Sequence, residues 1–187
     1  MTYLDTPGES PLYEADQVAQ GYIANYTRVF ALQPDVYGGW RQLVGAVKAG
    51  MDERRYELVT LAAARRLGST YCGLAHAKIL RDKFYGDEAL RAIAVDHHDA
   101  ELSEVDVAVM DFAEKVAADP AAVTQADAEV LRRHGLSDVD VFQVVVAACL
   151  RRFFSGVLDA VGATPDTVYN GLDAGLRAAL SVDPPTP

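Results

Sequence analysis

Apolar residues recur along this chain with the spacing of helices rather than strands. The clearest case is the segment 53–67, where Leu58, Leu61 and Ala62 share one helix face and Gly68 follows the last periodic position. Residues three and four apart meet on one side of a helix, and a glycine just beyond it suits the left-handed conformation that ends many helices. Strict alternation of polar and apolar residues is scarce. The pattern therefore predicts an all-α protein.

The same periodicity and the signals at helix ends predict a chain of helices separated by short stops. The expected ranges are 11–32 (with Gly21 as a weak point), 36–49, 53–67, 70–84, 87–95, 104–118, 139–161 and 168–180, with a shorter helix between Thr124 and Gly135. The expected N-caps, whose side chains accept an N–H of the first turn, are Ser10, Asp52, Ser69, Ser103, Thr124 and Ser137. Asp119-Pro120 is expected to stop the helix before it.

One domain is expected, because no repeat or low-complexity linker interrupts the helices. It covers residues 1–182, and the proline-rich segment 183–187 is expected to be a disordered tail. The stretch 144–150 is apolar nearly all round, which predicts a central helix. No apolar run is expected to reach the roughly 20 residues that cross a bilayer, so no membrane partner is expected.

Composition narrows the classes of function. The formal net charge is -10 and the sequence pI is about 4.7, and such acidity without a basic stripe argues against nucleic acid as a partner. The N-terminal residues lack the pattern of a secretory signal. Two cysteines, Cys72 and Cys149, exclude a disulfide scaffold. These observations together predict a cytoplasmic protein with reduced thiols.

Cys72 and His76 are the candidate chemical centre. They stand four residues apart on one expected helix, so their side chains share a face one turn apart. If Ser69 is the N-cap, Cys72 lies in the first turn, where unpaired N–H groups and the helix dipole favour a thiolate. His76 could hold the proton, and Glu57, one helix earlier, could orient the imidazole. Spacing alone equally allows a small core cysteine and a histidine without a catalytic role.

The run from Glu57 to His76 resembles the alkylhydroperoxidase D-like motif of the carboxymuconolactone decarboxylase superfamily. In that motif a glutamate precedes Cys-X-X-Cys-X-X-X-His by about one helix. The positions that match residues common in that family are Glu57, Gly68, Tyr71, Cys72, Ala75 and His76. Segments 119–124 and 135–138 are similar to a subgroup described only as peroxidase-related, and the resemblance covers roughly residues 36–162.

The resemblance implies an oligomeric all-α fold and a thiol peroxidase. Cys72 would react with a small hydroperoxide, His76 and Glu57 would manage protons, and Ser69 and Tyr71 would support the site. Ser69 replaces the family's first cysteine, which resolves the sulfenic acid, so a Cys-X-X-Cys cycle is impossible here. Reduction would then need an external thiol or a partner protein's thiol. Cys149 is expected to be a core residue, and Ser69 mainly a cap contributing about 1 kcal/mol.

Two alternatives stay open. One is a non-redox enzyme similar to the decarboxylase branch, with His76 as acid or base on a small lactone or acid. The other is a helical homo-oligomer whose ancestral site has decayed and which binds a ligand or partner. No cofactor is expected under any of the three hypotheses.

Other candidate residues have weaker patterns. His97-His98, between Asp96 and Asp99, has the composition of a metal site, but adjacent residues are expected to point apart and nothing completes the ligand set. A solvated loop without metal is therefore expected there. His134 is expected to place favourable charge at a helix end. The segment 151–154, Arg-Arg-Phe-Phe, could line a pocket or an interface.

Overall fold

The computed structural model describes residues 2–182, and these form helices with no strand. The predicted all-α fold class is confirmed. The elements in chain order are α1 (Pro11–Gln20), α2 (Asn25–Phe30), α3 (Pro34–Gly50), α4 (Glu53–Arg66), α5 (Thr70–Lys83), α6 (Asp87–Val95), α7 (Glu104–Ala118), η1 (Pro120–Ala122), α8 (Gln125–Arg133), α9 (Asp138–Ala160), η2 (Thr167–Gly171) and α10 (Ala174–Leu180). The expected tail 183–187 lies outside the described residues.

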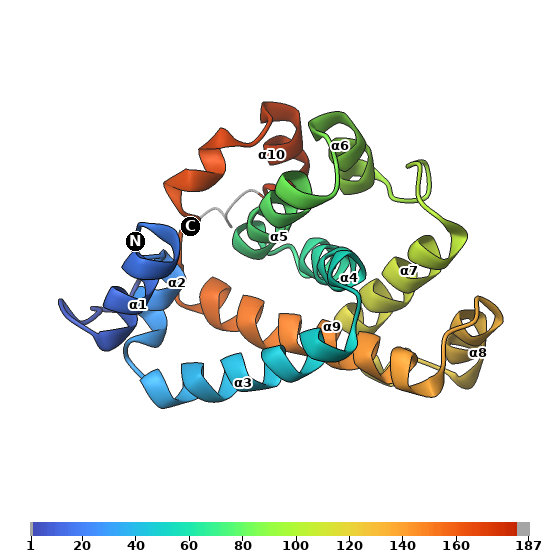
Figure 1. Ribbon diagram of the computed structural model, residues 1–187, viewed down its shortest axis with the longest axis horizontal. Coiled ribbons are helices and arrows are strands. Elements are labelled where there is room, and N and C mark those ends of the chain that lie inside the picture. Colours follow the sequence, from blue (N-terminus) through green and yellow to red (C-terminus); the bar gives the residue numbers. More distant parts are fainter. Residues whose placement is uncertain (1, 183–187) are drawn as a thin grey trace.

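Helix α4 is the centre of the core. It packs against α5, α7 and α9, and Figure 1 shows it end-on between them. Nine consecutive residues of α4, 56–64, are buried, and Leu58 and Leu61 are completely so. A helix buried on all sides must satisfy any polar group inside the protein, because water is not available there. Glu57 and Thr60, both fully buried on α4, meet that requirement through the site described below.

Helix α9 corrects two expectations. At 23 residues it is long and apolar enough, by length and composition alone, to cross a membrane, whereas no such run was expected. Half of its most apolar 18-residue window is buried in the structure, where α9 packs against α3, α4 and α7. The stretch 144–150 is not buried all round: Val144 and Ala147 are in the core, but Cys149 is exposed. The helix is therefore amphipathic, with its outer face turned toward α3.

The predicted helices 11–32 and 168–180 are each interrupted. Gly21 adopts φ 80°, a left-handed conformation that ends α1, and α2 begins only at Asn25. Near the C-terminus, a 3-10 turn comes first and Asp173 then caps α10 by accepting the N–H of Leu176. Both errors come from apolar periodicity that runs across a break.

Most expected caps are present. Asp52 accepts the N–H of Arg55, and Ser103 accepts that of Asp106. Ser137 and its partner acid Asp140 form the reciprocal capping box. Ser10 caps α1, and α7 stops at Ala118 before Asp119-Pro120, as expected. Thr124 donates its N–H and its hydroxyl to the Asp127 carboxylate but does not cap α8 with its side chain. Ser69 also does not cap its helix, and its hydrogen bond is described with the site below.

Candidate active site

The turn between α4 and α5 sets the position of the candidate residues. Gly68 adopts φ 69°, a left-handed conformation that favours glycine and ends α4. Ser69 follows at the N-cap position, so Cys72 is the third residue of α5 and His76 lies one turn further on. The predicted placement of both residues on one helix is confirmed, and His76 faces Glu57 of the buried α4.

Glu57, His76 and Lys48 form a chain of polar contacts through the core. The Nδ1 atom of His76 lies 2.5 Å from Oε2 of Glu57, and the Nζ atom of Lys48 donates to Oε1 of the same carboxylate at 2.9 Å. The Glu57 side chain is fully buried, that of His76 is 10% exposed and that of Lys48 is 36% exposed. These polar contacts therefore lead from the protein surface at Lys48 on α3, through Glu57 on α4, to His76 on α5.

Burial and neighbouring charges shift the pKa of both Glu57 and His76. Burial raises the pKa of Glu57, but His76 and Lys48 outweigh burial and lower the pKa to about 2, so Glu57 is ionised. Burial and then the nearby Arg151 guanidinium lower the pKa of His76, which favours the neutral imidazole. A neutral His76 beside a carboxylate at Nδ1 donates its proton there. Its Nε2 atom then carries the free lone pair and is the atom able to accept a proton.

Three residues that the sequence analysis did not assign to this site lie around His76. The hydroxyl of Thr60 is 3.1 Å from Nδ1 of His76 and donates to backbone oxygens of its own helix. The ring of Tyr56 meets the imidazole edge-on at 6.5 Å, and Lys48 lies over that ring at 4.7 Å. Thr60 was detectable in principle, since it follows Glu57 by three residues on the same helix. Lys48 was not, because only packing brings α3 to α4.

Arg151 is a buried cation of the same region. It is 3% exposed, its guanidinium lies 5.3 Å from the ring centroid of Phe154, and its Nε atom has no hydrogen-bond partner within residues 2–182. The segment 151–154 was expected to line a pocket or an interface. The structure divides it: Arg151 and Phe154 point into the core, while Arg152 caps α7 through the carbonyls of residues 117 and 118 and Phe153 is exposed.

Cys72 has an apolar environment. It is 1% exposed, belongs to the main hydrophobic cluster, and its sulfur makes no hydrogen bond to His76 or to any other described residue. The structure therefore brings Glu57 and His76 into direct contact, whereas Cys72 shares only the helix and its face. Direct proton exchange between Cys72 and His76 would need the two side chains to move into contact.

Ser69 and Tyr71 have partners that the sequence did not reveal. The expected capping bond of Ser69 is wrong: its hydroxyl donates to Oδ1 of Asp159 on α9, at 3.1 Å, instead of accepting an N–H of α5. Tyr71 is buried, donates its hydroxyl to Asp166 and accepts the backbone N–H of Tyr26. Both residues fasten the start of α5 to the C-terminal part of the chain.

Two further expectations are wrong. Cys149 was expected in the core, but it is exposed and lines a groove of about 470 Å³ between α3 and α9. His97 was expected in a solvated loop with its neighbour pointing elsewhere. Instead it is 3% exposed, and His97 and His98 direct their Nε2 atoms to Asp111 of α7. Cys149 differs because it lies on the outer face of α9. His97 and His98 differ because their loop folds back against α7.

Comparisons with known proteins identify solved structures of similar fold. No protein-family model matches the chain, and no curated protein matches it. Two solved structures cover 91% of this chain and 95% of their own at 22% identity: the alkylhydroperoxidase AhpD core of an uncharacterized peroxidase-related protein from Ralstonia eutropha JMP134, at a TM-score of 0.83, and an uncharacterized peroxidase-related protein from Silicibacter sp. TM1040, at 0.82.

A third structure of similar fold is that of an enzyme. It is a cysteine-to-alanine variant of the debrominase Bmp8 in complex with 2,3,4-tribromopyrrole, at a TM-score of 0.73 and 16% identity, with 95% of each chain covered. Identities this low establish architecture rather than activity. The chain therefore has the alkylhydroperoxidase D-like all-α fold, which is shared by peroxidase-related proteins and by a debrominase.

Proposed function

We propose that this protein is a member of the alkylhydroperoxidase D-like superfamily that reduces small hydroperoxides with Cys72 as its reacting thiol. The observation that carries the proposal is the contact of Glu57 with Nδ1 of His76, on the helix that bears Cys72 one turn away. That contact leaves Nε2 of His76 as a base. The fold shared with peroxidase-related proteins supports the same reaction class.

The proposed reaction consumes one hydroperoxide and two equivalents of an external thiol. His76 accepts the thiol proton of Cys72, and the thiolate attacks one peroxide oxygen. The O–O bond breaks, the leaving oxygen takes the proton from His76 and departs as water or an alcohol, and Cys72 becomes a sulfenic acid. A first external thiol condenses with the sulfenic acid and releases water. A second thiol then reduces the mixed disulfide and restores Cys72.

The burial of Cys72 limits the substrate and the reductant. A sulfur that is 1% exposed is open only to small peroxides unless the helices around it separate. Cys149 is exposed on α9, and both cysteines are free in the structure, which supports an external resolving thiol rather than an internal disulfide. We expect hydrogen peroxide to react faster than bulky organic peroxides.

The decisive experiment uses the purified full chain and hydrogen peroxide with a small thiol. Cys72→Ser should abolish both turnover and labelling by a sulfenic-acid probe, and Cys149→Ser, the matched control, should keep both within about twofold. His76→Asn should lower turnover by about 10²–10⁴-fold, the range of general acid–base contributions. Unchanged turnover in Cys72→Ser would contradict the proposal.

A second candidate function follows from the burial of Cys72. Its sulfur has no hydrogen-bond partner among residues 2–182, while the His76 side chain is 10% exposed and Glu57 favours the tautomer with the proton on Nδ1. These observations favour a non-redox enzyme in which His76 acts on a small lactone or acid. Activity toward such a substrate that survives Cys72→Ser and is lost in His76→Asn would support this candidate. If neither Cys72→Ser nor His76→Asn changes either activity, a ligand-binding protein with a decayed site would be favoured.

We also propose a homo-oligomer in the cytoplasm. The groove between α3 and α9 is lined mainly by apolar side chains. Three of these are large and exposed to solvent: Val36, Leu43 and Phe153. Exposed apolar patches of this kind often mark association sites. Light scattering at micromolar concentration should give a mass above the 20.2 kDa of one chain. A monomer that persists would contradict this proposal and leave the peroxidase proposal untouched.

A further inference from the structure

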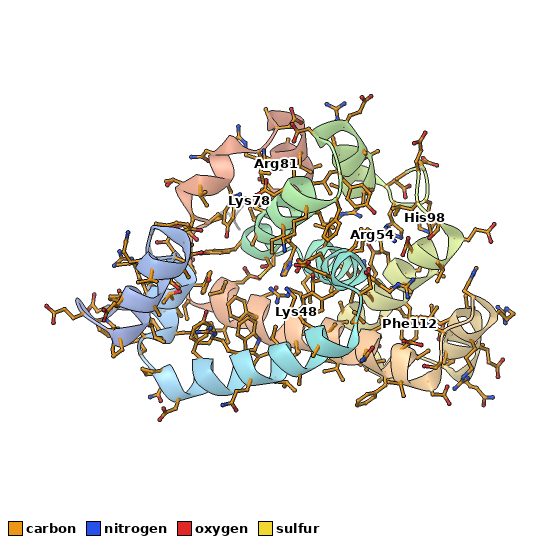
Figure 2. All side chains as sticks on the ribbon, viewed as in Figure 1. Lys48, Arg54, Lys78, Arg81, His98 and Phe112 are labelled. Carbon is orange, nitrogen blue, oxygen red and sulfur yellow. The ribbon has the colours of Figure 1, made fainter. Side chains whose placement is uncertain are left out.

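A cluster of side chains able to bind a metal ion lies outside this site, in the loop that joins α6 to α7 and on α7 itself. The Nε2 atom of His97 is 2.8 Å from Oδ1 of Asp111, and Nε2 of His98 is 2.9 Å from the same oxygen. The two imidazole rings lie 4.3 Å apart. Figure 2 shows His98 at the rim of the molecule, beside α7.

The loop folds back, which lets two adjacent histidines point the same way. After α6 ends, the chain turns at Asp96, whose carbonyl accepts the N–H of Asp99 at 3.3 Å. The Asp96 carboxylate accepts the backbone N–H of His98 at 2.9 Å and lies 3.0 Å from its Nδ1 atom. The sequence alone suggests the opposite arrangement, since neighbours in an extended or helical segment diverge.

His98 has a carboxylate oxygen at each of its ring nitrogens. Oδ1 of Asp96 faces Nδ1 and Oδ1 of Asp111 faces Nε2. A neutral imidazole carries only one N–H and cannot donate to both. When Nδ1 donates to Asp96, the Nε2 lone pair faces the Asp111 oxygen, and a cation between them would satisfy both atoms. A carboxylate that holds the far nitrogen of a metal-bound histidine is a common arrangement in metal sites.

Burial makes the cluster both rigid and open. The His97 side chain is 4% exposed, with Glu114 3.9 Å from its Nδ1 atom, so packing fixes that ring. His98 and Asp111 are 55% and 48% exposed, which gives an ion a path from solvent and leaves room for water in the coordination shell. Fixed and accessible ligands together are what a binding site requires.

We propose that Nε2 of His97, Nε2 of His98 and the Asp111 carboxylate bind one divalent transition-metal ion, with Zn²⁺ the best fit. Imidazole and carboxylate ligands suit zinc, and a tetrahedral ion with ligands at about 2.0–2.2 Å separates them by roughly 3.3 Å. The two observed nitrogen-to-oxygen separations, 2.8 and 2.9 Å, would each widen by about half an ångström to match that value. Asp96 positions His98 from outside the shell, and the ion ties the loop to α7.

The test uses the full chain, metal-free and without an affinity tag, titrated with Zn²⁺ by calorimetry and with Co²⁺ by visible absorption. The expected result is one ion per chain and a higher melting temperature with Zn²⁺, since a ligand that binds only the folded state stabilises it. His98→Ala and Asp111→Asn should each weaken binding by at least about 100-fold, and Asp96→Asn by about 10–100-fold, as for other outer-shell partners. Both first variants change half-exposed residues, so folding should survive.

The matched control is His134→Ala, which removes an exposed histidine at the end of α8 and should bind Zn²⁺ like the unchanged chain. Zn²⁺ affinity that is equal in the unchanged chain and in His98→Ala would overturn the proposal. So would a loss of affinity of the same size in His134→Ala, because it would indicate binding by surface histidines in general. The cluster would then be a set of ion pairs around a protonated His98.

Discussion

The two histidine–carboxylate clusters use the same chemical groups in opposite environments. His76 meets Glu57 in the core, where the carboxylate is fully buried, whereas His98 meets Asp96 and Asp111 at the rim with about half of each side chain exposed. Figure 2 labels Lys48 beside the central α4 and His98 at the outer end of the loop before α7. The comparison shows that burial, rather than residue type, decides what such a pair can do.

In the core, the low dielectric strengthens the attraction between paired charges and makes an unpaired charge costly. Glu57 stays ionised because Lys48 and His76 face it. Both oxygens of its carboxylate have a partner, and such a rigid, hydrogen-bonded cluster is suited to moving a proton. At the rim, water screens the same attraction, and the cluster contributes little to stability. Its exposed atoms are free to exchange partners, which suits capture of an ion.

The largest expected effect is on the buried carboxylate. Glu57→Gln keeps the shape but leaves Lys48 without its counter-charge, and should lower the free energy of unfolding by about 2–3 kcal/mol. That is below the loss for a fully buried pair, because Lys48 is 36% exposed. Chemical denaturation at neutral pH measures it. Glu53→Gln, one turn earlier on α4 and paired with the exposed Lys83, should leave stability almost unchanged. Equal losses in the two variants would break the comparison.

Acid should reproduce that loss in the unchanged chain. The pKa of Glu57 is lowered from 4.5 to about 2 in the folded state, so its stabilisation is complete above about 4.5 and is lost as the pH falls toward 2. Integrated over that shift, about 2 kcal/mol should be gone by about pH 3. The measurement is the difference between the pH–stability curves of the unchanged chain and Glu57→Gln, which cancels the other carboxylates. Parallel curves below pH 4.5 would contradict the assignment.

A third carboxylate, Asp166, should give a smaller effect. Tyr71→Phe removes the hydroxyl that donates to Asp166, while the backbone N–H of Asn25 still donates to that carboxylate at 2.8 Å. The expected loss is about 1–2 kcal/mol, typical of a buried polar group deprived of one partner. Thermal unfolding measures it. Tyr3→Phe changes a residue that is 81% exposed; this control variant should unfold at an unchanged temperature.

The smallest effect is expected at the rim. In the metal-free chain His98→Ala should change the free energy of unfolding by less than about 0.5 kcal/mol, because the side chain is 55% exposed and its ion pairs are screened. Denaturation in the presence of a chelator measures it. A loss comparable to that of Glu57→Gln would show that the rim cluster is a structural element and would remove the contrast between the two regions.

The helices were largely predictable because their signals are local. Asp52 and Ser103 cap the helices that follow them, and Gly68 ends α4 in the left-handed conformation, as the sequence indicated. The break at Gly21 was predicted only as a weak point of one long helix, and the break before Asp173 was missed, since apolar residues on both sides keep a helical period across them. An apolar period indicates which residues will be buried, but two consecutive helices can carry it as well as one.

The candidate site was predictable only along one helix. The spacing of Cys72 and His76 placed both on α5, and the resemblance of the motif assigned Glu57 to the same site. Lys48 and Arg151 could not be assigned, because they come from α3 and α9 and only packing brings them near His76. Sequence distance carries no information about such neighbours.

The amino-acid sequence by itself determined the all-α class, most helix ends and the shared face of Cys72 and His76, because backbone hydrogen bonding and side-chain period act over a few residues. Tertiary structure alone decided which polar groups lie in the core. It buried Cys72, exposed Cys149 and turned His97 and His98 toward Asp111. The physical reason is that burial and charge pairing depend on which helices meet, and that is settled by the packing of the whole chain.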